Sequence, residues 1–428
     1  MSLLPPDHSD RFALADEVHA RPPEPVETPS RASYVAVLVD ADDRESEVEH
    51  LAALCERFGV APPGPGASHF SARLAGLRIK WERHGEFSGY TFYAPGRSPE
   101  PFSQPVSSLL PPRWLEQVPG RTLVAAHAKL VPADAGLPDA AELASYFNGN
   151  TAVGADIGDG AGMAFTDFRI HEDGCSRFVV FDRSFTQRQA GRMLQRLFEI
   201  EVYRMLALLA LPIARRQLPR IVAIEKSLAE LTDGIAKGGG NDEDLLHELT
   251  RLAAEVESGL AASQFRFGAC RAYDALVRTR ISELREKRIA GIPPIEEFMA
   301  RRFTPAVATC STVSQRLRDL SERVAQASAL LSTRVDIARE CQNQALLASM
   351  DRRAKLQLRL QQTVEGLSVA AIVYYVAGVT GYVAKALKAG GLHIDPDLVV
   401  GAAIPLVALA VMRAVRRARR HARAADSH

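Results

Sequence analysis

The sequence predicts an α+β N-terminal domain with a mixed sheet, followed by a long-helix bundle and a C-terminal two-helix transmembrane hairpin. Short apolar runs rich in β-branched residues within the first 185 residues predict the sheet. From residue 186 onward the apolar residues recur at helical spacing, which predicts the bundle. Two long uncharged stretches near the C-terminus predict the hairpin.

Composition limits the class of protein. The chain has 428 residues, which allows two or three domains of roughly 100 to 200 residues each. Lys and Arg total 52 and Asp and Glu total 51, so the near-neutral charge argues against a protein that mainly binds nucleic acid. The five cysteines are scattered without a Cys-x-x-Cys pair, which favours reduced thiols in a cytoplasm. The N-terminus lacks the basic start and apolar stretch of a signal peptide, so we expect the first domain to be cytoplasmic.

We expect residues 1–30 to form an extended arm and residues 31–185 to form the mixed α/β domain. Tyr34–Val39 is an apolar run typical of a buried strand, and Arg44–Phe58 has helical spacing. Leu77–Arg83 alternates in polarity, as a strand does. Asp173-Gly174 suits a tight turn, so the strands on either side of it should form a hairpin. The remaining expected elements are strands at Tyr90–Tyr93, Thr122–Val131, Met163–Ile170 and Arg177–Phe181, and a helix at Asp139–Phe147.

Residues 186–304 are predicted to be helical, with a glycine-rich joint at Gly238–Asn241. Residues 305–365 are predicted to form one long stalk helix, because there is no proline or glycine between Pro305 and Gly366. Such a helix would be about 90 Å long and would continue into the first membrane span. Its first part carries apolar residues at steps of four and three, typical of a coiled coil or bundle: Val313, Leu317, Leu320, Val324, Ala327 and Leu331.

The predicted membrane spans are residues 366–388 and 392–413. Gly366–Ala384 contains no charged residue and would reach about 28 Å as a helix, close to the ~30 Å of a hydrocarbon core. The second uncharged run, Leu398–Met412, is shorter. Small residues in the first span would permit close helix packing: Ala377, Gly378 and Gly381.

A basic tail, residues 414–428, follows the second span, whereas the loop between the spans balances two lysines with two aspartates. Because basic flanks stay on the cytoplasmic side, both termini should be cytoplasmic in a bacterial inner membrane. The lipid bilayer is the first expected partner, and anionic lipid should attract the basic residues at the end of the span and in the tail: Arg413, Arg416, Arg417, Arg419 and Arg420.

The passage Gly149–Gly162 is the most enzyme-like part of the sequence. Glycines allow backbone N–H groups to approach a phosphate, and Asp156 and Asp159 are suited to hold a cation. With Asn148 and Asn150 they are candidate ligand or interface residues. The passage has neither the ending of a phosphate loop nor a dinucleotide fingerprint, and its alternative role is a plain connection between strands.

A second candidate cluster is Glu17, His19 and Arg21, just before Pro22-Pro23. A carboxylate, an imidazole and a guanidinium this close together suit anion binding, proton transfer or a protein interface. The sequence contains neither a His-Glu-x-x-His zinc motif nor a Gly-x-Ser-x-Gly nucleophile motif. We therefore expect no enzyme and no cofactor, and the sequence does not identify a metal.

Three passages carry a resemblance to a known family: Glu17–Pro23, Tyr146–Gly162 and Leu358–Gly366. Together they are similar to a bacterial family of uncharacterised membrane-anchored proteins, domain of unknown function 3422, over nearly the whole chain. The resemblance implies a two-span anchor and no particular activity.

The overall layout also resembles that of CorA-type magnesium channels, which are homopentamers whose stalk helices line the pore. This CorA-like layout implies a homo-oligomer. The chain departs from that family at the end of the first span, where Gly378-Val379-Thr380 and Gly381-Tyr382-Val383 stand in place of Gly-Met-Asn.

Three functions follow as hypotheses. The first is a homo-oligomeric membrane protein that transports or senses an ion. The alternative is a membrane-tethered scaffold or regulator that binds a cytoplasmic protein and uses the hairpin only as an anchor. The third is a tethered enzyme that uses the glycine-rich passage.

Overall fold

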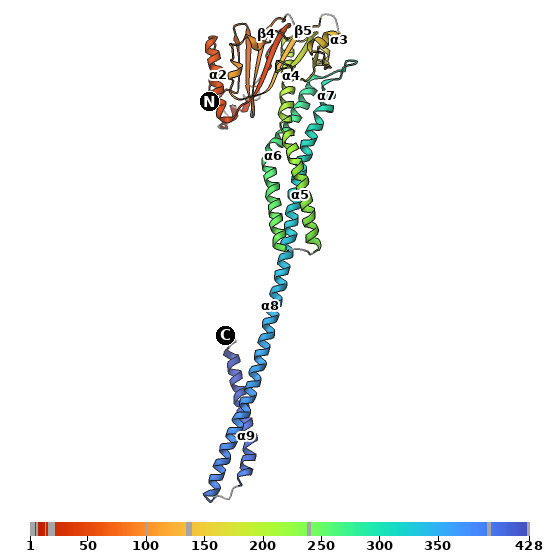
Figure 1. Cartoon of the computed structure of the whole chain (residues 1–428). Coiled ribbons are helices and arrows are strands. Elements are labelled where there is room, and N and C mark those ends of the chain that lie inside the picture. Colours follow the sequence, from red (N-terminus) through yellow and green to blue (C-terminus); the bar gives the residue numbers. More distant parts are fainter. Residues whose placement is uncertain are drawn as a thin grey trace. The chain divides into compact units, whose positions relative to one another are not determined.

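A computed structural model describes residues 5, 7–12, 14–15, 22–98, 102–133, 139–237, 241–391 and 395–425, and for 418–425 the backbone alone (Figure 1). The chain divides into two compact units, Met1–Ser328 and Ala329–His428. The predicted mixed sheet, the long helices after it and the two apolar C-terminal helices are all confirmed.

The described residues of the first unit form an eight-stranded sheet with the order β2-β3-β4-β1-β5-β8-β7-β6. Neighbouring strands run antiparallel except for β5 and β8, which are parallel, so the sheet is mixed as predicted. The strands are β1 Ser30–Leu38, β2 His69–Leu74, β3 Leu77–Arg83, β4 Phe87–Pro95, β5 Arg121–Pro132, β6 Val153–Ile157, β7 Gly162–Thr166 and β8 Ser176–Asp182.

The two outermost strands, β2 and β6, were not predicted. In β2 only Leu74 is fully buried, so the strand lacks a strong apolar pattern. The expected strand Met163–Ile170 ends earlier, at Thr166, because Phe168 has a φ of 53° that a strand does not tolerate. β7 and β8 do form the expected hairpin, and Gly174 in its loop has the positive φ, 78°, that favours glycine.

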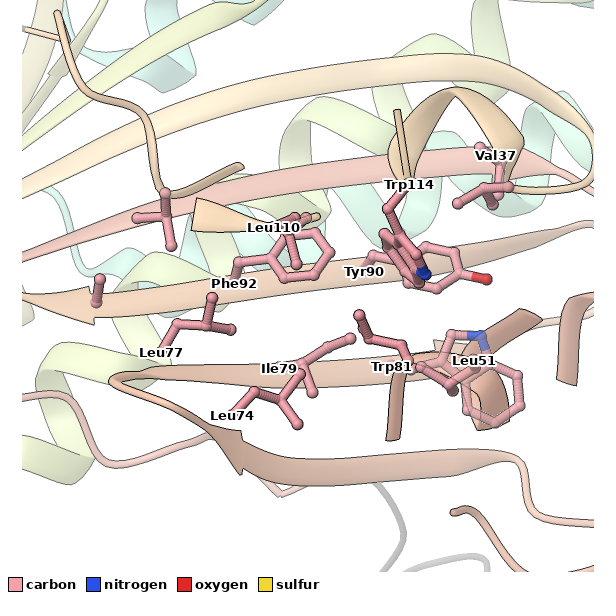
Figure 2. Close-up of a cluster of buried hydrophobic side chains, with 14 of the residues drawn as sticks. Val37, Leu51, Leu74, Leu77, Ile79, Trp81, Tyr90, Phe92, Leu110 and Trp114 are labelled. Atoms are coloured by element: carbon pink, nitrogen blue, oxygen red, sulfur yellow. The ribbon is translucent and has the colours of Figure 1, made fainter. Parts of the chain in front are cut away.

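One face of the sheet packs against helix α2 (Arg44–Arg57) and the short helical turns η2 (Val106–Leu109) and η3 (Leu115–Gln117). Figure 2 shows this cluster, in which large side chains of β3 and β4 meet Leu51 and Trp114. Burying a large apolar side chain contributes roughly 1.5–3 kcal/mol, so the cluster is a main source of stability. The buried members at its centre are Leu51, Leu54, Ile79, Trp81, Tyr90, Phe92 and Trp114.

The long helices follow the sheet in the sequence, whereas α2 and α3 lie between its strands. Helix α4 begins with a capping box, in which Thr186 and Gln189 satisfy each other's backbone N–H groups. Asn241 caps α6, and the glycines 238–240 before it lie outside the described residues. The helices are α3 Ala140–Tyr146, α4 Gln187–Leu208, α5 Leu211–Lys237, α6 Asp242–Leu284, α7 Ile295–Arg302, α8 Thr304–Ala389 and α9 Pro396–Ala425.

The first part of α8 packs against α5 and α6. Arg316 donates to Glu225 of α5 at 2.7 Å, and Ser321 donates to Glu257 of α6 at 2.7 Å. The side chains at steps of four and three are buried here: Val313, Leu317, Leu320, Val324 and Ala327. The expected seam is therefore the inner face of a helical bundle. Farther along α8, every residue from 336 to 364 is exposed.

The second unit contains the rest of α8 and all of α9. α8 ends at Ala389, and Gly391 just beyond it has the left-handed φ, 101°, typical of a residue after a helix. α9 begins with Pro396, and Asp395 before it accepts a hydrogen bond from the backbone of Asp397 at 3.2 Å. Within the described residues, these two helices are long and apolar enough to cross a membrane.

Candidate functional site

The glycine-rich passage forms the β6–β7 hairpin. Its turn has positive φ at Gly158, Asp159 and Gly160. The strand glycines have no room for a side chain: a Cβ at Gly154 would lie 2.3 Å from a backbone oxygen, and one at Gly162 would lie 2.2 Å from the ring of Phe185. Turn geometry and close packing therefore account for these glycines without a phosphate.

The two aspartates of this hairpin are paired with arginines. Asp156 accepts a hydrogen bond from Arg183 at 2.6 Å, and Asp159 pairs with Arg285 at the end of α6. The backbone of Asp156 also pairs with Lys287 in both directions, at 3.0 and 2.8 Å. A cation would have to displace both arginines. Across the described residues no group of three or more His, Cys, Asp or Glu is arranged to hold a metal.

The two asparagines before the hairpin have other partners. Asn148 accepts a hydrogen bond from Arg177 at 3.0 Å. Asn150 donates to the buried carboxylate of Asp167 at 2.9 Å, and His171 lies 3.0 Å from the same oxygen. The structure thus engages the four predicted side chains with four different partners and does not assemble them into one ligand site.

The cluster of Glu17, His19 and Arg21 lies outside the described residues. The segment after it is described, and it packs on the start of α4. The N–H of Val26 donates to the carbonyl of Gln187 at 2.9 Å, and Glu24 pairs with Arg78 of β3. At Gly191 an added Cβ would lie 1.7 Å from the carbonyl oxygen of Glu24, so the arm crosses directly over this glycine.

A buried charged layer between the sheet and α4 was not predicted. Lys80 of β3 lies 2.9 Å from Glu82 and donates to Gln195 of α4 at 3.2 Å. Glu199, one turn farther along α4, pairs with Arg280 of α6. The alternating pattern of Leu77–Arg83 predicted the strand but not the burial of its polar residues, since both faces of β3 are largely covered. In the sequence, the only sign of this buried layer was the alternation of polar and apolar residues along β3.

Tyrosines line the same layer. The Tyr34 ring stacks on Phe198 at 5.0 Å, and burial raises the pKa of Tyr34 well above its usual value, with a further contribution from Glu82. Burial also raises the pKa of Tyr203. The cavity between these groups has a volume of about 10 Å³, which is room for about one water molecule. The layer is suited to fixing α4 on the sheet rather than to holding a substrate.

Helix α6 is joined to the sheet and to α4 through polar side chains spaced seven residues apart. Arg266 pairs with Glu86 in the β3–β4 turn, and Tyr273 donates to the same carboxylate at 3.0 Å. Arg280, seven residues farther on, makes the pair with Glu199 described above. Two turns of an α-helix take about seven residues, so the three side chains lie on one face of α6. The bundle is thereby fixed to the sheet.

The candidate spans pack on each other through small residues. An added Cβ at Gly381 would lie 3.2 Å from Val400 of α9, and Ala384 is only 3% exposed. Ala377 is half-buried and follows the same helical spacing. An added Cβ at Gly378, in contrast, meets nothing within 4 Å. Two of the three predicted packing residues therefore lie toward α9, and Gly378 does not.

The rest of the hairpin surface is apolar and exposed. Tyr374 is 79% exposed and Leu398 is 73% exposed. Three of the predicted basic residues, Arg413, Arg416 and Arg417, are exposed at the end of the apolar part of α9. The side chains of Arg419 and Arg420 lie outside the described residues.

Comparison with known proteins gives one match. A family model described as a protein of unknown function (DUF3422) matches residues 6–422. No curated protein and no solved structure matches the chain. These comparisons therefore do not show a likeness to CorA-type channels.

Proposed function

We propose that this chain, which belongs to the DUF3422 family of proteins of unknown function, is a membrane-tethered scaffold or regulatory protein. The hairpin of α8 and α9 holds the chain in the bilayer. The sheet and bundle of the first unit lie on the cytoplasmic side and bind another protein there.

The observation that carries the proposal is the exposed apolar surface of the hairpin. Both candidate spans are almost entirely unburied within the described residues. Exposed apolar surface costs roughly 25 cal/mol per Å² in water, and a bilayer removes that cost. The contact of Gly381 with Val400 supports a hairpin that packs through small residues, as membrane helices do.

Charge supports the orientation. Arg413, Arg416 and Arg417 follow the second span, while the loop between the spans carries lysines balanced by aspartates. The basic end of a membrane helix stays on the cytoplasmic side. Two spans return the chain to its starting side, so the first unit is cytoplasmic as well.

The difference between the two edges of the sheet supports binding of a protein partner. At one edge β6 is covered, because Gly154 donates to the carbonyl of Pro293 and Asp156 pairs with Lys287. At the other edge β2 pairs only with β3 among the described residues. An edge strand of this kind accepts an extended peptide as a further strand.

Membrane insertion and orientation are testable with the native cysteines. Cys341 is exposed and the other four are buried, so a membrane-impermeant maleimide should label Cys341 alone. We expect the full-length protein to resist extraction by alkaline carbonate, and Cys341 to react only in inside-out vesicles. With Cys341 replaced by Ser, a new cysteine at Gly390 in the loop should react only from the opposite side. Release by carbonate, or labelling of both positions from one side, would refute the tether.

A flux assay separates the scaffold from ion transport. The purified protein is reconstituted into vesicles that contain a Mg²⁺-sensitive dye, with protein-free vesicles as the control. A tether gives the same Mg²⁺ entry in both. Protein-dependent entry would overturn the scaffold in favour of transport.

A further inference from the structure

A second heptad pattern runs along the exposed part of α8, on a face that α9 does not cover. We call it the α8 seam. Its members follow steps of four and three, the spacing of residues that pack between two helices. The pattern continues into the first candidate span at Ala371, Tyr374 and Gly378. In the segment before that, the α8 seam consists of Leu346, Met350, Arg353, Gln357, Leu360, Val364 and Leu367.

The apolar side chains of the α8 seam are exposed to an unusual degree. Leu346 is 61% exposed, Met350 63%, Leu360 67% and Leu367 75%. Every residue from 336 to 364 is exposed in the part of the chain that the structure describes. A single helix gains nothing from a row of large apolar side chains in water, whereas burial of each contributes roughly 1.5–3 kcal/mol.

Charge is distributed as it is in a helix that meets another helix. The positions that flank the α8 seam are uncharged and include two further leucines, Leu347 and Leu356. Arg353 is the one charged residue among the seam and flanking positions of residues 346–367. All other charged residues of that segment are at the outer heptad positions: Asp351, Arg352, Lys355, Arg359 and Glu365. In coiled coils the outer positions face water.

The α8 seam passes without a break from the water-facing helix into the candidate span. A partner that covers it must therefore offer a helix that also runs from water into the membrane in the same register. A second copy, anchored in the same membrane with the same orientation, provides such a helix. Each large side chain can bury on the order of 100 Å² of surface. The exposed members of the α8 seam and the flanking leucines together therefore approach the roughly 800 Å² that each partner buries in a stable interface.

We infer that a second copy of this chain packs in parallel and in register along the α8 seam. This interface goes beyond the proposed tether, which requires no second copy. In the pair, Arg353 faces Arg353 of the other copy, with Gln357 in the next layer. A polar layer inside a coiled coil fixes the register and lowers the stability of the assembly. Replacing Arg353 by Leu should therefore tighten association.

Two leucines provide a matched test. Leu360 lies in the α8 seam, whereas Leu358 is at an outer position and is also well exposed, at 57%. Leu360→Arg and Leu358→Arg place the same charge in the same helix. We expect the measured mass of the full-length protein in detergent to be that of an oligomer for the wild type and for Leu358→Arg. In Leu360→Arg the dissociation constant should rise at least about tenfold, which corresponds to ~1.4 kcal/mol.

A monomeric wild type, or equal effects of the two substitutions, would overturn the inference. Carbonate extraction of Leu360→Arg keeps this outcome separate from failure of the tether, because the variant should remain in the membrane.

Cysteine cross-linking in membrane vesicles tests the parallel register. Leu360→Cys should form a disulfide between copies under mild oxidation, because equivalent seam positions meet. Leu358→Cys should not. Native Cys341 is exposed and lies at an outer position of the same heptad, so it is an internal control that should stay free. Equal cross-linking at residues 358 and 360 would exclude the parallel arrangement.

Discussion

Gly191→Ala should detach the N-terminal arm from α4 and destabilise the first unit. In the native structure an added Cβ at this position would lie 1.7 Å from the carbonyl oxygen of Glu24, which is far inside any van der Waals contact. The backbone of the arm must therefore move away from α4. Val26, which is 5% exposed and donates to the carbonyl of Gln187, would lose its packing and its hydrogen bond.

The expected magnitude follows from these contacts. Exposing Val26 costs about 1.5–3 kcal/mol, and the lost backbone hydrogen bond costs about 1 kcal/mol. Alanine in place of glycine within a helix returns roughly 0.5–1 kcal/mol. The net loss in the free energy of unfolding should therefore be about 2 kcal/mol. Gly268 in α6 is the matched control, because an added Cβ there meets nothing within 4 Å and Gly268→Ala should be neutral or stabilising.

Tryptophan fluorescence provides the assay. The chain has two tryptophans, Trp81 and Trp114, and both lie in the core cluster of the first unit. Urea unfolding of the full-length protein in detergent, followed by their emission, reports on that unit. If Gly191→Ala unfolds at the same urea concentration as the wild type, the arm does not cross α4 at this position.

Two further predictions concern a buried histidine and the hairpin. Burial lowers the pKa of His127, so below pH ~6.5 the unfolded chain binds a proton that the folded chain excludes. The free energy of unfolding should fall as the pH drops through that range. Urea unfolding of His127→Gln should show a weaker dependence of this free energy on pH, and the same pH dependence in wild type and variant would contradict the prediction. Gly381→Ile should lower the melting temperature in detergent, because the larger side chain forces Val400 away. Gly401→Ile is the control and should not lower it, because an added Cβ at Gly401 meets nothing within 4 Å. Equal melting temperatures for the two variants would show that α8 and α9 do not pack at Gly381.

Much of the fold could be predicted from local pattern. The strand at Leu77–Arg83 has the same bounds as β3, and the helix predicted from Arg44 begins there in α2. The outer strands were missed because burial, which produces the apolar signal, is weak at the edge of a sheet. β2 has one fully buried residue, and β6 lies within the glycine-rich passage.

The candidate site was harder to predict because its chemistry depends on distant partners. Asp156 and Asp159 had the composition of a ligand site, but Arg183 and Arg285 occupy both carboxylates. Glu47, in contrast, was missed because nothing in the local pattern marked it as a buried residue. It is polar in a helix whose apolar face was clear, yet it is fully buried and accepts hydrogen bonds from Trp81 and Tyr90.

The sequence by itself determined the helices, most strands, the apolar C-terminal hairpin and the heptad spacing of α8, because each is a periodicity within one continuous segment. Only the tertiary structure decided which side chains meet. It brought Lys80 of β3 to Gln195 of α4, and it paired Arg266 of α6 with Glu86 in the β3–β4 turn, although 180 residues separate the last two in the sequence. It also left the α8 seam uncovered. Contacts of this kind depend on the order of strands and the packing of helices, and no local pattern encodes them.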